Sequence, residues 1–146
     1  MKKKAKREKK QQPPGLRVDQ KKRDRVAAVL GTMVGLLTIT EGGRVLLGLA
    51  TPPYTVLPWL VWYNVVMGVV SVAAGVGIWL ERSWSIDVGV NILVFHAIVF
   101  AGLVGMQKFG QPVAMVSIFA MLFRTFIWIV IVSLVKWKRQ DRGEKA

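Results

Sequence analysis

The chain has 146 residues, 53% of them hydrophobic, and its mean hydropathy of +0.41 is higher than that of an ordinary soluble domain. Its formal net charge is nevertheless +13, from 21 Lys and Arg against 8 Asp and Glu. Cysteine is absent and there is one histidine. Disulfides, thiolate chemistry and a metal centre built from several histidines of one chain are therefore excluded.

The positive charges are segregated from the apolar residues. Twelve of the 21 basic residues lie in the first 25 positions, five follow Val135, and only four lie between. An apolar middle with basic ends is typical of a polytopic membrane protein. We therefore predict an all-α fold, an antiparallel bundle of four transmembrane helices.

Residues 1–25 contain almost no apolar side chains and include Pro13-Pro14-Gly15, which predicts a disordered basic tail. Two roles stay open. One is attraction to an anionic partner, which is lipid head groups, at about 1 kcal/mol per basic residue near the surface, nucleic acid or the ribosome. The other is retention of the tail in the cytoplasm. No aromatic residues alternate with the basic ones, which disfavours nucleic acid as a partner. The side chains assigned to head-group contact are Lys2, Lys3, Lys4, Lys21, Lys22, Arg23 and Arg25.

The first predicted helix covers residues 26–50. Ala27, Gly31 and Gly35 recur at every fourth position, a pattern that lets a neighbouring helix approach closely. Residues 51–58 contain three prolines and no charge, so they end the helix and form a loop.

Three more predicted helices follow, at 59–80, 86–106 and 113–135. Each has about 20 largely apolar residues or more, enough to cross a hydrocarbon core of about 30 Å. Small residues at spacing four predict close packing again, at Ser71 and Gly75 and at Ala97, Ala101 and Gly105. Residues 137–146 are predicted to form a second, short basic tail.

Aromatic and basic residues predict the orientation. Five of the six tryptophans lie at predicted helix ends, as in an interfacial aromatic belt: Trp59, Trp62, Trp79, Trp84 and Trp137. The basic residues favour a cytoplasmic location for both termini and for the turn at Arg82. The loop 51–58 and the turn at Lys108 are then outside, and the expected location is the bacterial inner membrane.

Three ionisable residues on three predicted helices fall at similar depths. At about 1.5 Å per residue from the outer helix ends, Glu41 lies about 13 Å deep, His96 about 15 Å and Arg124 about 16 Å. Charged groups at such depths are costly and mark candidate functional sites. We predict a buried polar cluster of Glu41, Arg44, His96 and Arg124, supported by Asn64, Ser117 and Trp128.

Two pairings within this cluster stay open. Glu41 can pair with Arg124 across the bundle, or locally with Arg44, three residues further along. The Gly42-Gly43 pair could also break the helix and place residues 44–50 along the membrane surface. His96 could join the ion pair, serve as a ligand, or be a satisfied structural residue. Trp128, four residues after Arg124, could stack on the guanidinium.

Two segments resemble a known group of proteins. They are Ala120-Met121-Leu122-Phe123-Arg124-Thr125-Phe126-Ile127-Trp128 and Trp59-Leu60-Val61-Trp62-Tyr63-Asn64. Together they are similar to small, uncharacterised bacterial four-helix membrane proteins over residues 26–136. This resemblance implies the four-helix fold and the bacterial inner membrane, and it implies no activity or residue role.

The sequence contains no paired carboxylates, nucleophile motif, phosphate-binding loop or metal-ligand cluster, so we predict that the protein is not an enzyme and has no cofactor. The favoured function is an accessory or scaffold subunit in the membrane, as a homo-oligomer or part of a larger membrane complex. The alternative is a small homo-oligomeric, proton-coupled transporter that uses Glu41. Both functions have the lipid bilayer as their surroundings.

Overall fold

The computed structural model describes the backbone of residues 14–143 and the side chains of residues 20–136. In this part of the chain all regular structure is helical: α2 (Pro14–Leu46), α3 (Pro58–Trp79), α4 (Trp84–Lys108) and α5 (Met115–Gly143). The predicted tail residues Lys2, Lys3 and Lys4 lie outside the described residues.

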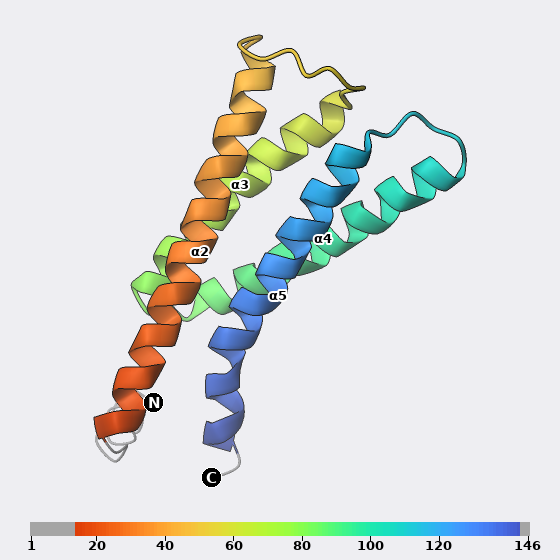
Figure 1. The fold of residues 1–146 in the computed structure, drawn as a ribbon. Helices are drawn as coiled ribbons and strands as arrows, with labels where there is room; N and C mark the ends of the chain where they lie inside the picture. Colours follow the sequence, from red (N-terminus) through yellow and green to blue (C-terminus); the bar gives the residue numbers. More distant parts are fainter. Residues whose placement is uncertain (1–13, 144–146) are drawn as a thin grey trace.

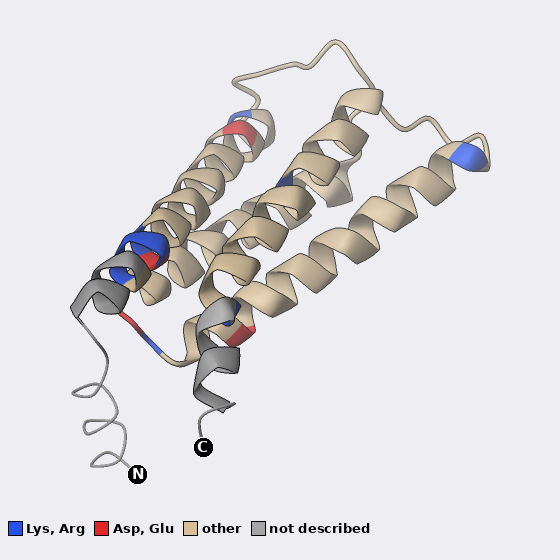
Figure 2. Ribbon diagram, turned by 60° about the horizontal axis from the view of Figure 1, so that its bottom comes forward, with Lys and Arg blue, Asp and Glu red and all other residues tan. Residues whose placement is uncertain are grey.

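The described helices form one bundle. Each of the four contains a segment long and apolar enough to cross a membrane. Neighbours along the chain pack together, and α2 also packs against α5. The 47–57 and 109–114 connections lie at one end of the bundle, and the short α3–α4 turn lies at the other (Figure 1). Charged residues lie mainly toward the ends of the helices (Figure 2).

Helix α2 begins at Pro14, so the prediction of a disordered segment is wrong for residues 14–25. Proline is compatible with the first helical position, because the N–H that it lacks has no acceptor within the helix there. The residues that follow include Leu, Arg, Lys and Gln, all good helix formers. Arg25 then lies 5.6 Å from the ring centroid of Trp79 on α3, which ties this basic end to the bundle by a cation–π contact.

Residues in the left-handed region follow α2, α3 and α4; the one after α3 is Glu81, with φ +54°. After α2, Gly48 has φ +69°; its N–H donates to the Val45 carbonyl, and that of Leu49 donates to the Arg44 carbonyl at 2.8 Å. Gly110, with φ +77°, follows α4 with the same pair of bonds. This arrangement satisfies the last carbonyls of a helix. Helix α2 therefore runs straight through Gly42-Gly43, which do not break it.

Glycines allow α2 and α3 to approach closely. A Cβ atom added at Gly35 would lie 2.7 Å from the carbonyl oxygen of Gly68, and one at Gly75 would lie 2.7 Å from the backbone nitrogen of Thr32. Backbone therefore faces backbone along this crossing, as the small residues of the sequence predict for these two helices.

Two apolar clusters make up the core. One, toward the α3–α4 turn, joins all four helices through Ala27, Ala28, Ala74, Ile78, Ile92, Trp128, Ile131 and Val135. The other, at the opposite end, consists of Leu60, Leu103, Val113, Ile118 and Met121. Its residues come from α3, α4, α5 and the segment before α5. Buried Thr38 and His96 belong to neither cluster.

One face of α4 is left without a neighbour in the described chain. Ala97 and Ala101, predicted to pack closely, are exposed, and a Cβ atom added at Gly102 or Gly105 would meet nothing within 4 Å. We call this the outer face of α4 and define it by Asn91, Val94, Phe95, Ile98, Ala101, Gly102 and Gly105. All of these residues are exposed except the half-buried Gly105, and their spacing of three and four residues places them on one side of the helix.

Candidate functional site: a polar cavity between α2, α3 and α5

Arg124 on α5 is hydrogen-bonded to two other helices. Its Nε donates to Oγ1 of Thr38 on α2 at 3.1 Å, and its Nη1 donates to Oδ1 of Asn64 on α3 at 3.0 Å. Thr38 is only 5% exposed. One guanidinium thus connects three helices, and both acceptors are neutral.

A second polar contact joins α3 to α4. The hydroxyl of Tyr63 lies 2.8 Å from Nδ1 of His96, and the two rings are tilted by 56° with centroids 5.8 Å apart. His96 is 3% exposed. The phenol therefore satisfies one ring nitrogen of the single histidine, which supports the structural interpretation of His96.

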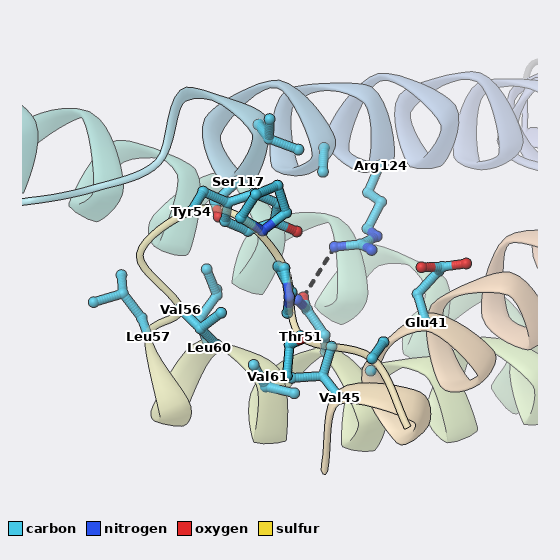
Figure 3. Close-up of a pocket in the computed structure, with 17 residues that line it drawn as sticks. Glu41, Val45, Thr51, Tyr54, Val56, Leu57, Leu60, Val61, Ser117 and Arg124 are labelled. Atoms are coloured by element: carbon cyan, nitrogen blue, oxygen red, sulfur yellow. Dashed lines mark hydrogen bonds between the residues drawn. The ribbon is translucent and has the colours of Figure 1, made fainter. Parts of the chain in front are cut away.

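A cavity of about 350 Å³ adjoins Arg124. It is lined by α2, α3, α5 and the 47–57 connection. Its polar lining consists of Glu41, Thr51, Tyr54, Asn64, Ser117 and Arg124; its apolar lining includes Val45, Leu57, Leu60, Val61, Val116 and Ala120. In Figure 3, Glu41 and Arg124 lie at one end of the cavity, and Leu57 and Val56 lie toward the other.

The predicted ion pairs of Glu41 are not formed between the residues that the structure describes. Glu41 is exposed and shares the cavity with Arg124, yet no ion pair joins it to Arg124 or to Arg44. Arg44 is exposed and lies outside the cavity lining. The structure therefore brings Glu41, Asn64, Ser117 and Arg124 together around one space, while His96 lies in a separate contact.

Trp128 does not take the predicted position over Arg124. Its ring is completely buried in the apolar cluster, where an added Cβ atom at Gly89 would lie 3.2 Å from it and one at Gly31 would lie 3.7 Å away. The ring thus fills the space that these glycines leave. Its buried Nε1 has no hydrogen-bond partner among the described residues.

The arrangement around Arg124 suits the binding of an anionic group. A guanidinium has five N–H donors, and the described residues accept bonds from Nε and Nη1. Further donors are therefore available on the side of the cavity. Planar guanidinium groups bind carboxylates through two parallel hydrogen bonds, so Arg124 has the donors to recognise such a group.

Thr38 and Tyr63 were not among the predicted site residues. Charged residues marked the predicted site, and Thr38 is a neutral residue inside an apolar run. Tyr63 adjoins Trp59 and Trp62, which are exposed and consistent with an aromatic belt. The spacing could have indicated Thr38, because it lies three residues before Glu41 and so on a similar face of the helix, one turn away.

Comparisons with protein-family models, curated proteins and solved structures found no match to this chain. The fold and the apolar composition of the helices still indicate the class of protein. Four long, apolar helices in the described residues indicate a multi-pass membrane protein of the α-helical type. The polar cavity between three of these helices is its candidate functional site.

Proposed function

We propose that the protein is a non-enzymatic accessory subunit of a larger membrane complex, in the bacterial inner membrane. The outer face of α4 carries this proposal. Asn91 is exposed and has no hydrogen-bond partner among the described residues. It lies seven residues after Trp84, the first residue of α4, and so about 10 Å into an inserted helix.

An amide in this position is costly in lipid. Transfer of such a group from water to an apolar medium without a hydrogen bond costs roughly 2–7 kcal/mol, depending on the reference state. A helix of another subunit offers hydrogen-bond partners to Asn91. The exposed Ala101 and Gly102 on the same face let that helix approach closely. Both features favour protein over lipid against α4.

The topology that goes with this function is antiparallel, with both termini in the cytoplasm. Basic residues gather at the start of α2 and the end of α5, and Arg82 lies in the α3–α4 turn. The connection 47–57 has no charged residue. This distribution agrees with the excess of basic residues on the cytoplasmic side of membrane proteins. Anionic lipid head groups on that side can attract Lys21, Lys22 and Arg23, which are exposed.

Cysteine cross-linking in native membranes tests the proposal, because the chain has no cysteine of its own. We compare Ile98→Cys on the outer face of α4 with Val69→Cys on α3; these β-branched residues are 60% and 56% exposed. A partner helix on α4 predicts one cross-linked product of defined mass from position 98 only. Adding Asn91→Leu should abolish that product.

The mass of the product decides the kind of partner. A product of greater mass than a dimer of this chain supports the accessory role, provided that the same product forms in the complex that co-purifies with the chain. Equal amounts of cross-linked product from positions 98 and 69, or no product from either position, would show that lipid covers the outer face of α4. Either result would refute the accessory role. A product at twice the mass of the chain would favour the second candidate.

The second candidate is a homo-oligomeric, proton-coupled transporter. The observation that favours it is that Glu41, a titratable carboxylate, lines the same cavity as Arg124. Such a carrier predicts proton uptake into proteoliposomes that is lost in Glu41→Gln and retained in Arg44→Gln. The accessory role predicts no difference between these variants.

A further inference from the structure

We infer that the cavity between α2, α3 and α5 binds a small zwitterion that carries a carboxylate, an ammonium group and a compact apolar body. This inference does not depend on the accessory role. It rests on three features: the charges that line the cavity, the distribution of its apolar walls, and its position relative to the helix ends.

The charges favour a ligand with both signs. Arg124 is held by two neutral acceptors, and no acidic group forms an ion pair with it among the described residues. Glu41 contributes the opposite charge to the same cavity. A carboxylate alone would satisfy Arg124 and be repelled by Glu41, whereas a zwitterion satisfies both groups.

The remaining lining favours a small organic molecule with an apolar portion. The volume of about 350 Å³ lies at the lower end of the range of ligand pockets. Away from Glu41 and Arg124, the side chains of Val61, Leu60 and Leu57 form aliphatic walls on the side of α3, with the neutral polar residues Tyr54 and Ser117 opposite them. Charged groups at one end and uncharged, partly aliphatic walls at the other would orient such a molecule.

The position of Arg124 favours a ligand from the aqueous phase over a lipid head group. Arg124 is nine residues from Met115, where α5 begins, and therefore about 13 Å along the helix. This is well below the level of head groups. The 47–57 connection, which contributes Thr51 and Tyr54 to the lining, lies on the side from which a soluble molecule would arrive.

Three matched probes test the charge requirement. They are leucine, 4-methylpentanoate, which lacks its ammonium group, and 3-methylbutylamine, which lacks its carboxylate. Binding is measured by calorimetry on the full chain in phosphatidylcholine nanodiscs. We expect leucine to bind with a Kd below about 1 mM, and each truncated probe to bind at least about tenfold more weakly, as expected for the loss of a charge-assisted hydrogen bond.

Variants locate the binding in this cavity. Glu41→Gln should weaken leucine binding by about tenfold and leave 4-methylpentanoate unaffected or bound more tightly. Arg44→Gln, an exposed charge outside the lining, is the matched control and should change neither. Ala120→Leu adds aliphatic bulk to the cavity wall and should reduce binding without removing a charge.

Each of the following results would overturn the inference. The first is a failure of the probes at the level of binding or of charge: no probe binds at 10 mM, about ten times the expected Kd limit, or leucine and 4-methylpentanoate bind equally. The second is unchanged leucine binding in both Glu41→Gln and Ala120→Leu. The third is displacement of leucine when phosphatidylethanolamine, whose head group is also a zwitterion, is added to the nanodiscs, because the occupant would then be a lipid.

Discussion

The glycine crossing of α2 and α3 can be tested by adding a single methyl group. In Gly35→Ala the new Cβ atom would lie 2.7 Å from the Gly68 carbonyl oxygen and 2.8 Å from the Val72 backbone nitrogen. These neighbours are backbone atoms, which a rotamer change cannot move away. Ordinary Cβ contacts begin near 3.4 Å, so α2 and α3 must separate by about 0.7 Å, the difference between these distances.

Gly43→Ala provides the matched control on the same helix, because an added Cβ atom there meets nothing within 4 Å. Both substitutions gain up to about 1 kcal/mol of helix propensity. Only Gly35→Ala carries the cost of overpacking, typically about 1–3 kcal/mol. The difference in unfolding free energy between the two variants therefore isolates the packing cost, and we expect it to be about 1–3 kcal/mol.

Reversible unfolding in mixed micelles, followed by circular dichroism as dodecyl sulfate is added, measures this difference. Gly43→Ala should be as stable as the parent or slightly more stable, and Gly35→Ala should be less stable. If Gly35→Ala proved as stable as Gly43→Ala, α2 and α3 would not be in backbone contact at Gly35.

Three further predictions concern the polar contacts and the topology. A double-mutant cycle of Arg124→Met with Asn64→Leu should give a coupling energy of about 0.6–1.7 kcal/mol, as found for hydrogen bonds between membrane helices. The coupling energy of Arg124→Met with Glu41→Gln should stay below about 0.5 kcal/mol. A larger coupling of Arg124 to Glu41 than to Asn64 would show that the ion pair forms after all. Tyr63→Phe should lower the unfolding free energy by roughly 0.6–1.7 kcal/mol, whereas the control Tyr54→Phe, in the exposed connection, should leave it unchanged. Equal effects of the two substitutions would show that the hydrogen bond from Tyr63 to His96 contributes nothing to stability. Reporter fusions after residues 55, 83, 110 and 146 should read outside, inside, outside and inside, and a cytoplasmic reading at 55 would contradict the topology.

The sequence predicted the helices well because the bilayer-length apolar runs are separated by proline, glycine and charge. It failed at the start of α2, where Pro13-Pro14-Gly15 suggested a break. A proline ends a helix only when it lies in the interior, and at the first position it is neutral or favourable. The α2 end at Leu46 was also missed, since the left-handed residue Gly48 has no distinctive neighbours in the sequence.

The sequence predicted that Glu41 and Arg124 belong to one site, and both line the cavity, but it did not predict their pairing. The predicted depth of Glu41 was counted from Ala50, whereas α2 ends at Leu46. Arg124 lies on α5. Its partners depend on how each helix is rotated, which counting does not give. Rotation places Thr38 and Asn64 against the guanidinium and leaves Glu41 on the cavity lining, and the same rotation directs Trp128 into the apolar cluster.

The polar contacts also bear on the order in which the protein can be made. Three of the side-chain hydrogen bonds between the described helices join the first pair of helices to the second: Thr38 and Asn64 to Arg124, and Tyr63 to His96. Within the first pair, α2 and α3 meet through glycine backbone and need nothing that emerges later from the ribosome. During synthesis the α2–α3 hairpin can therefore form early, while Thr38 and Asn64 remain without their donor until α5 has been translated. A nascent chain that stalls before residue 124 would leave the Thr38 hydroxyl and the Asn64 amide without the donor that they have in the complete bundle.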